Sequence, residues 1–307
     1  GCASMHAVLQ LLAPGDHLVV CADIYGGTYR LIEQLVKPTG VSVDWVDMGD
    51  AEAVQSAMRQ TTKMIWIETP TNPLLRVFDI EALSRMAHAQ GAITVVDNTF
   101  ATPLLQRPLA LGADIVVHSM SKYLNGHSDV VAGAVISDPV EVSERLRFIQ
   151  RAGGAVPSPF DCYLVARGIK TLPLRIARHC ESALELATWL REHRRVSAVH
   201  YPGLDDHPEH ALATRQMDGF GGMLSFEVDA GMDGARALLD RVALFSLAES
   251  LGGVESLIGH PALMSHASIP EATRWARGIA DGLVRVSVGL EDVEDLRQDL
   301  DQALESA

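Results

Sequence analysis

Residues 91–122 read GAITVVDNTFATPLLQRPLALGADIVVHSMSK. Two short, almost wholly apolar segments of this stretch, ITVVD and IVVHS, end at Asp97 and Ser119. Segments of this length and apolarity predict buried strands, and strands without polar alternation are typical of a parallel sheet covered by helices on both faces. The carboxyl ends of parallel strands meet at one edge of the sheet, where such folds bind ligands. We therefore expect Asp97, Ser119 and the following Lys122 at a common rim.

The same alternation of strands and helices extends through the chain. In the first half, apolar runs predict strands at 17–21, 42–46, 64–67, 93–96 and 115–117, with helices at 2–12 and 80–90. In the second half, a long helix at 174–192 precedes strands at 222–228 and 283–288 and helices at 232–239 and 293–304. This order predicts an α/β fold: a large domain over 1–172, with a mostly parallel sheet covered by helices, and a smaller C-terminal α+β domain over 173–307.

Composition excludes several classes of protein. The net charge of -14 has the wrong sign for a phosphate-backbone binder, so nucleic acid is not an expected partner. No apolar run has the length of about 18 residues that a membrane helix needs, so no membrane is expected. The cysteines fit neither a CxxC redox pair nor a zinc cluster, which predicts no metal site and buried or half-buried thiols in a reducing cytoplasm. The chain opens at Gly1 without an initiator Met, so a preceding segment is expected.

The predicted rim offers the groups that an aldehyde cofactor with a phosphate requires. Lys122 alone reads as a surface charge and Asp97 alone as a helix cap or turn residue. Together they offer an amine, whose pKa burial can lower until it forms an imine, and a carboxylate for a protonated pyridine nitrogen. Ser119, Ser121 and the helix start at Gly1–Cys2 offer hydroxyls and backbone N–H groups for the phosphate.

Residues 118–133, HSMSKYLNGHSDVVAG, closely resemble the lysine signature of the Cys/Met-metabolism family of pyridoxal-phosphate enzymes. That family includes cystathionine γ-lyase, γ-synthase and β-lyase, and methionine γ-lyase, on the type I fold. Further family-like blocks follow in family order: DIYGGTYRL (23–31), WIETPTNPLL (66–75), VVDNTFATPLLQRPLALGAD (95–114), GAVPSPFDCYLVARGIKTLPLR (154–175), LAESLGGVESLIGHPALMSHASIP (247–270) and LVRVSVGLEDVEDL (283–296). Nearly the whole chain is covered.

The resemblance implies pyridoxal 5′-phosphate as the cofactor and a role for each candidate around it. Lys122 carries the cofactor as an imine and shuttles protons, Asp97 pairs with the pyridine nitrogen, and Tyr25 stacks on the ring. The phosphate is held by Gly1, Cys2, Ser119 and Ser121, with Cys2 contributing only its backbone N–H.

For the substrate, the resemblance implies that Asn72 and Arg285 hold the carboxylate, with Ser250 close by. A planar guanidinium suits a carboxylate because it donates two parallel hydrogen bonds. Loop supports are expected at Tyr123, Asn125 and Gly126.

The substrate prediction rests on a few positions. Glu249 stands where cystathionine γ-lyases and γ-synthases carry Glu, and Gly27 stands where methionine γ-lyases carry Cys. Arg30 is a candidate for the distal carboxylate of a two-headed substrate, whereas Tyr29 is unusual for a γ-lyase. The GAVPSPFDCYL run (154–164) resembles γ-lyases more than synthases. These features predict a transsulfuration enzyme of amino-acid biosynthesis that cleaves L-cystathionine by γ-elimination to cysteine, 2-oxobutanoate and ammonia, with Tyr25 protonating the leaving sulfur.

Two other reactions remain open at this point. One is γ-replacement on an acylhomoserine, as in cystathionine γ-synthase. The other is carbon–sulfur cleavage of methionine, cysteine, a persulfide or a biosynthetic thioether. A binding or scaffold role without catalysis is disfavoured because Lys122 and Asp97 are both present. The resemblance also implies a homotetramer, built as a dimer of dimers, with each site completed by the neighbouring subunit.

Overall fold

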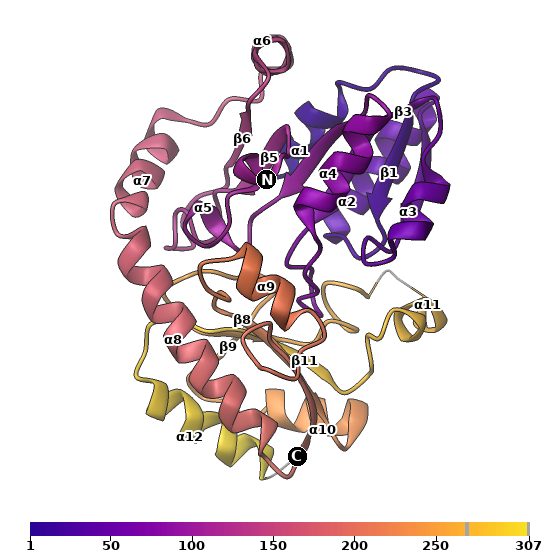
Figure 1. The fold of residues 1–307 in the computed structure, drawn as a ribbon. Coiled ribbons are helices and arrows are strands. Elements are labelled where there is room, and N and C mark those ends of the chain that lie inside the picture. Colours follow the sequence, from indigo (N-terminus) through magenta and orange to yellow (C-terminus); the bar gives the residue numbers. More distant parts are fainter. Residues whose placement is uncertain (268–269, 306–307) are drawn as a thin grey trace.

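The computed structural model describes residues 1–267 and 270–305; residues 268 and 269 of the family-like block 247–270, and the last two residues of the predicted C-terminal domain, lie outside the described part. Its first sheet has the strand order β2-β1-β3-β4-β5-β6 (Figure 1). The strands are β1 (His17–Cys21), β2 (Ser42–Val46), β3 (Thr62–Glu68), β4 (Ile93–Asp97), β5 (Ile115–Ser119) and β6 (Gly133–Ser137). All neighbours pair in parallel except β5 and β6, which are antiparallel. The mostly parallel sheet predicted from the sequence is confirmed.

Helices cover both faces of this sheet, as the apolar strands require. Alternate residues of β1 enter separate clusters: Leu18 and Val20 pack with α1, and Val19 and Cys21 pack with α3 and α4. The helical elements around the sheet are α1 (Cys2–Leu9), α2 (Gly26–Leu31), η1 (Ile32–Val36), η2 (Lys37–Thr39), α3 (Ala51–Ala57), α4 (Ile80–Ala89), α5 (Thr102–Leu105), η3 (Pro108–Leu111) and α6 (Val140–Gly153).

The second sheet has the order β7-β8-β11-β10-β9, antiparallel apart from the β10–β9 pair. Its strands are β7 (Val196–His200), β8 (Met223–Val228), β9 (Ser246–Leu247), β10 (Leu257–Gly259) and β11 (Leu283–Ser287). Its helices are α8 (Leu172–Arg191), α9 (His210–Gln216), α10 (Gly231–Leu239), α11 (Glu271–Ala276) and α12 (Val293–Leu304). The predicted stripe of α12 is buried through Leu296, Leu300 and Leu304. Figure 1 shows α7 (Pro159–Ile169) leading into α8, which runs down to this sheet.

Several elements differ from the prediction. The first helix ends at Leu9 rather than residue 12, because the chain turns at residues 10–11 ahead of Pro14, and α8 begins two residues before the predicted start at 174. Strand β6 was not anticipated, since it is a half-buried edge strand without a full apolar run. Helices α6 and α7 and the short strands β7, β9 and β10 were missed as well. The domain boundary at residue 172 stays a prediction.

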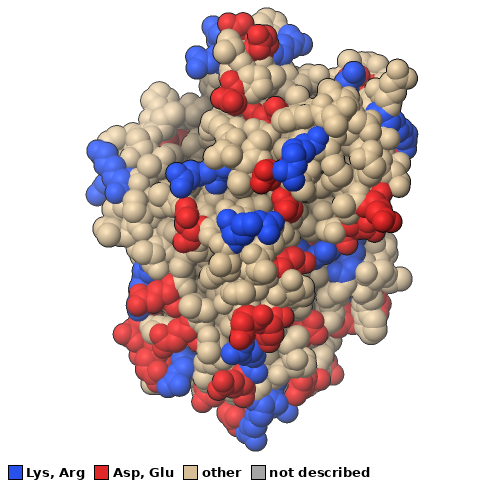
Figure 2. Space-filling model, viewed as in Figure 1, with Lys and Arg blue, Asp and Glu red and all other residues tan. Residues whose placement is uncertain are grey.

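The thiol prediction is partly wrong. All four cysteines are free, and Cys21 is buried and Cys180 half-buried, but Cys2 and Cys162 are exposed. Both exposed cysteines lie in the first turn or two of a helix, α1 and α7, on the side that faces solvent. On the face seen in Figure 2, Lys and Arg side chains alternate with Asp and Glu and form no continuous basic patch. Within the described residues, no helix is both long and apolar enough to cross a bilayer.

Candidate cofactor and substrate site

Strands β3, β4 and β5 end at one edge of the first sheet. Glu68 at the end of β3 pairs in register with Asp97 at the end of β4, and β5 ends alongside at Ser119. Lys122 follows within the turn after β5, where its backbone N–H donates to the Ser119 carbonyl at 3.3 Å. The structure therefore places an acid, a hydroxyl and an amine on the rim that the strand pattern indicates.

Lys122 is half-buried, and its amine contacts the segment between β9 and β10 of the second sheet. Its Nζ donates a hydrogen bond to Ser250 Oγ at 2.8 Å. Burial, and next the positive charge of Arg285, lower the pKa of Lys122 to about 8, with the negative charge of Glu249 opposing them. A sizeable fraction of this amine is consequently neutral near physiological pH, as nucleophilic attack on an aldehyde requires.

The other three lysines of the chain offer a direct comparison. Lys37, Lys63 and Lys170 are all exposed. Exposed lysines are solvated cations, whereas imine formation needs a partly desolvated amine. By this criterion Lys122 is the lysine of this chain that suits a covalent cofactor.

Asp97 is only 4% exposed and is held by Thr99, a residue that the sequence analysis did not single out. Asp97 Oδ1 accepts hydrogen bonds from the Thr99 backbone N–H at 3.0 Å and from Thr99 Oγ1 at 2.5 Å. The same hydroxyl accepts the Ser119 N–H at 2.9 Å. Burial raises the pKa of Asp97, and the two bonds from Thr99 oppose that rise. The available signal was the Asp-x-Thr spacing, which allows the carboxylate to bond two residues ahead.

The predicted phosphate ligands lie together. A Cβ atom placed on Gly1 would stand 3.1 Å from Ser119 Oγ, so the Gly1 backbone and this hydroxyl are adjacent. The Gly1 nitrogen donates to the Ala132 carbonyl at 2.8 Å, and Ser121 Oγ accepts the Ala132 N–H at 3.0 Å. A Cβ on Gly133 would overlap Ser4 Oγ and crowd the Gly1 nitrogen, so this cradle has no room for a larger residue.

Helix α1 begins at Cys2, so the backbone N–H groups of its first turn point out of the helix toward this cradle. Such groups lack intrahelical acceptors and favour a bound anion. The Cys2 side chain itself is exposed. Only its backbone enters this assignment, as the sequence analysis expected.

Tyr25 precedes α2 and contacts the rim through its backbone, while its ring lies over the start of that helix. Its N–H donates to Glu68 Oε2 at 2.8 Å, and its ring lies against Gly27, where an added Cβ would overlap the ring carbons. Gly27, read from the sequence as a marker of substrate class, thus also makes room for the tyrosine. Burial is the main cause that raises the pKa of Tyr25, so its hydroxyl is protonated at neutral pH.

Arg285, on β11, gathers three of the predicted substrate residues. Its guanidinium donates to Asn72 Oδ1 at 3.0 Å, to the Glu249 carbonyl at 2.8 Å and to the Ser250 carbonyl at 3.1 Å. Burial lowers the pKa of Arg285 to about 10, which leaves it cationic at neutral pH. Because Ser250 also accepts from Lys122, the carboxylate-binding candidates lie beside the amine.

Arg30 and Glu249 are exposed, unlike the buried Arg285. Both charges act on the Tyr25 hydroxyl, Arg30 lowering its pKa and Glu249 raising it. Arg30 Nη1 would lie 3.6 Å from a Cβ atom on Gly26, the neighbour of Tyr25, and Glu249 lines the same small cavity as Arg285. Tyr29, the unusual residue beside Arg30, packs on Trp45 with ring centroids 5.0 Å apart.

Arg175 was missed by the sequence analysis and supports the loop that follows Lys122. It is 4% exposed and donates to the Tyr123 carbonyl at 2.8 Å and the Gly168 carbonyl at 2.9 Å. Gly126 has a φ of 77° and lies so close that any Cβ there would strike the Arg175 guanidinium. An arginine facing the core from the apolar side of a helix was the signal available in the sequence.

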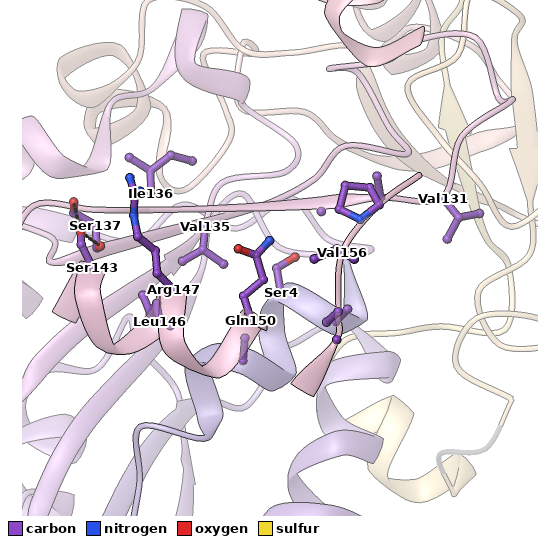
Figure 3. Close-up of a pocket in the computed structure, with 17 residues that line it drawn as sticks. Ser4, Val131, Val135, Ile136, Ser137, Ser143, Leu146, Arg147, Gln150 and Val156 are labelled. Atoms are coloured by element: carbon purple, nitrogen blue, oxygen red, sulfur yellow. Dashed lines mark hydrogen bonds between the residues drawn. The ribbon is translucent and has the colours of Figure 1, made fainter. Parts of the chain in front are cut away.

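A cavity lies elsewhere in the described part of the chain. It measures about 470 Å³ between α1, β6 and α6, and Figure 3 shows Ser4, Arg147 and Gln150 among its lining side chains. None of the predicted site residues lines it, so we assign the chemistry to the rim instead. A second cavity, of about 10 Å³, includes Glu249 and Arg285 in its wall.

A group of potential metal ligands lies at the C-terminal end. His193 Nε2 stands 3.2 Å from Asp301 Oδ1 and 3.9 Å from Glu305 Oε1, and both acids are exposed. Arg194 already pairs with Glu305. We assign this group no role.

The donor set at the rim fits pyridoxal 5′-phosphate: a partly neutral buried amine, a buried carboxylate, and clustered hydroxyl and N–H groups. The sequence profile described as "Cys/Met metabolism PLP-dependent enzyme" matches residues 1–305. The chain belongs to this family of enzymes, whose cofactor is pyridoxal 5′-phosphate.

Proteins similar to this chain are named for different reactions. The chain is 51% identical to a cystathionine beta-lyase of Coxiella burnetii over 99% of this chain and 79% of that protein. It is 50% identical to a cystathionine gamma-synthase of Mycobacterium tuberculosis over 97% of this chain and 76% of that protein. The solved cystathionine gamma-lyase of Lactobacillus plantarum, complexed with L-serine, superposes with a TM-score of 0.97 at 44% identity over 100% of this chain and 80% of that one. The predicted type I fold is confirmed.

Proposed function

We propose that this enzyme is a carbon–sulfur lyase that cleaves L-cystathionine by γ-elimination. The observation that carries the proposal is that two exposed, oppositely charged side chains flank the site: Arg30 reaches Gly26, next to Tyr25, and Glu249 is held through its carbonyl by Arg285. Cystathionine has two amino-acid heads, each with a carboxylate and an ammonium group. Asn72 and Arg285 suit the carboxylate of the reacting head, and the exposed pair suits the carboxylate and ammonium of the distal head.

The cofactor is held, in this proposal, by the residues on the rim. Lys122 anchors its aldehyde carbon, Asp97 binds the protonated pyridine nitrogen and Tyr25 covers the ring. Its phosphate is bound by Gly1, Cys2, Ser119 and Ser121. When bound, pyridoxal phosphate supplies an electron sink that acidifies the C–H bond next to the substrate amine.

Two side chains of the rim are suited to moving the protons. Lys122, with a pKa lowered to about 8, can accept a proton at Nζ and release it again close to neutral pH. Ser250 Oγ, 2.8 Å away, orients that amine. Tyr25 keeps its proton at neutral pH and can donate it to the sulfur as the Cγ–S bond breaks. Overall, cystathionine and one water yield cysteine, 2-oxobutanoate and ammonia.

The names of the relatives favour two other reactions as well. Cystathionine β-elimination breaks the bond on the other side of the sulfur and gives homocysteine, pyruvate and ammonia. Replacement at the γ carbon joins cysteine to an acylhomoserine and releases the acid. In this proposal all three reactions would use Lys122 to anchor the cofactor, so the rim does not distinguish them. The contacts around Arg30 and Glu249 bear more on which of the reactions named for the relatives this enzyme performs.

Product analysis separates these reactions. The holoenzyme is incubated in parallel with cystathionine, methionine, cysteine, and acylhomoserine plus cysteine, and the keto acids and thiols are identified by mass spectrometry. We expect cystathionine to be turned over fastest and to give 2-oxobutanoate with cysteine. Pyruvate with homocysteine, or faster synthesis than cleavage of cystathionine, would overturn the proposal.

Variants of Arg30 and Glu249 test separately whether these two residues bind the distal head of cystathionine. Glu249→Gln and Arg30→Gln should raise the KM for cystathionine about two- to fivefold, a modest effect because both residues are exposed and screened by solvent. The KM for methionine, which has one head, should stay within about twofold. Equal effects on both substrates would refute the assignment of this pair to the distal head.

We also propose that the enzyme works as a homotetramer with sites completed by a neighbouring subunit. Supporting this, large apolar side chains are exposed on consecutive helices: Phe148 on α6, Phe160 and Tyr163 on α7, and Leu174 on α8. Helix α7 packs through Val165 on the loop that follows Lys122, so an association there would lie beside the site. Light scattering on the holoenzyme should give four subunits, and a fully active monomer would contradict this proposal. A cytoplasmic location is supported by four free cysteines.

A further inference from the structure

Glu68 is a buried acid that the proposed reaction does not use. It ends β3, is 4% exposed, and pairs in register with Asp97 at the end of the neighbouring parallel strand. Neighbouring strands lie about 4.8 Å apart and paired residues of parallel strands share a face of the sheet, so the two buried carboxyl groups are neighbours on the rim. A buried acid beside a functional carboxylate needs a physical explanation, because burying a charge is costly.

The Glu68 carboxyl group also fixes Tyr25. Its Oε2 accepts the Tyr25 N–H at 2.8 Å, across 43 residues of sequence. Tyr25 caps α2 after a bend that follows β1, and the residue is 41% exposed, so packing alone constrains it weakly. The contact to Glu68 ties that bend to the strand end beside Asp97.

The proton between the two acids is better placed on Glu68 than on Asp97. Two buried carboxylates this close cannot both ionise without a large cost. Asp97 Oδ1 accepts two hydrogen bonds from Thr99, whereas Glu68 accepts one from Tyr25. Burial raises the pKa of Glu68, and the negative charges of Asp97 and then Asp23 raise it further.

We propose that Glu68 is a positioning residue of the cofactor site: as a neutral acid it holds the Tyr25 backbone in place and leaves the negative charge of the pair on Asp97. The inference rests on the roles proposed above for Tyr25 and Asp97. It assigns to Glu68 no contact with substrate and no transfer of a proton. Its distinctive consequence is that an amide should serve as well as the acid.

Two variants of similar size separate the acceptor from the charge. Glu68→Gln keeps a carbonyl oxygen for the Tyr25 N–H and has no charge. Glu68→Met keeps the volume and removes the acceptor. Cofactor affinity is measured on apoprotein by quenching of tryptophan fluorescence, for which buried Trp66, two residues before Glu68, is a built-in reporter. The absorbance spectrum of the bound cofactor is recorded across neutral pH as the second readout.

The expected result is that Glu68→Gln binds pyridoxal phosphate within about twofold of the unmodified enzyme and keeps its spectrum. Glu68→Met should bind at least about fivefold more weakly, because the part-buried Tyr25 N–H loses its acceptor, and its spectrum should shift as Tyr25 is released. Glu227→Gln, which changes a half-buried acid of β8 bound to His200, is the control and should alter neither readout.

Glu68→Gln binding as weakly as Glu68→Met, or failing to fold, would overturn the inference, since the charge would then be needed. Glu68→Met behaving like the unmodified enzyme would overturn it as well. Asp97→Asn, measured alongside, tests the proposed function separately. Unchanged affinity and spectrum in Asp97→Asn would remove the role of Asp97 itself, whatever Glu68 does.

Discussion

Replacing Thr99 with valine removes one hydroxyl that serves two residues of the rim. Thr99 Oγ1 donates to Asp97 Oδ1 at 2.5 Å and accepts the Ser119 N–H at 2.9 Å. Valine has nearly the same shape, so the substitution deletes both hydrogen bonds and leaves the packing volume unchanged. Local stability at the ends of β4 and β5 should fall.

The size of the effect follows from the two bonds. A hydrogen bond to a carboxylate contributes about 1.5–3 kcal/mol and one between neutral groups about 1 kcal/mol. Thr99 is half-buried, and water can replace part of what is lost. We therefore expect the local opening free energy to fall by about 2 kcal/mol, which corresponds to about 30-fold faster hydrogen exchange.

The loss should also depend on pH. Burial raises the pKa of Asp97 in the folded protein, so the folded state binds a proton that the unfolded state has already released, and stability falls as pH rises from about 3.9 through the raised value. The bond from the Thr99 hydroxyl opposes this rise in pKa, and so does the Thr99 backbone N–H, which valine keeps. Without the hydroxyl the pKa of Asp97 climbs further, and the destabilisation should be larger at about pH 8 than at about pH 5.

The measurement is the rate of amide hydrogen exchange of the apoprotein, followed by mass spectrometry on peptides that cover Asp97 and Ser119. Thr99→Ser, which keeps the hydroxyl, is the matched control and should exchange within about threefold of the unmodified protein. A Thr99→Val rate within about twofold of the unmodified protein, or a Thr99→Ser variant as fast as Thr99→Val, would refute the reasoning.

Three further outcomes are expected. Lys122→Ala should have no detectable steady-state turnover, because both the covalent anchor and the base are lost; turnover retained in rate assays would contradict that role. The rate at which apoprotein attaches pyridoxal phosphate, followed by stopped-flow absorbance, should rise as pH increases through about 8, since the neutral fraction of Lys122 grows above its lowered pKa; a flat profile would contradict it. Gly27→Ala should weaken cofactor affinity about tenfold or more, because its Cβ overlaps the Tyr25 ring, and unchanged fluorescence titration would refute this.

The rim could be predicted from the sequence because its cause is local. Apolar runs with no polar alternation indicate parallel strands, and their ends bring Asp97, Ser119 and Lys122 together wherever the helices pack. The edge strand β6 was missed because the prediction depended on fully apolar runs, and this half-buried strand lacks one.

The contacts that complete the site could not be read from local pattern. Lys122 contacts Ser250 across 128 residues of sequence, and Arg285 contacts Asn72 across 213. Only the family resemblance predicted that these residues share one site. Nothing in the sequence distinguishes Glu68 from any other strand-end acid until the register with Asp97 is known.

Thr99 and Arg175 show the same limit on a smaller scale. Each acts through backbone groups of other segments, Thr99 on Ser119 and Arg175 on the loop after Lys122. A role of this kind depends on where two backbones pass each other, and that follows from packing rather than from residue type.

The most direct test of the central claim is to locate the cofactor. The holoenzyme is reduced with borohydride, which fixes an imine as a stable amine, then digested and mapped by mass spectrometry. The chain has four lysines, Lys37, Lys63, Lys122 and Lys170. We predict that the pyridoxyl mass is found on the peptide containing Lys122, at close to one per chain. Label on one of the three exposed lysines instead, or no label at any of the four, would contradict the account.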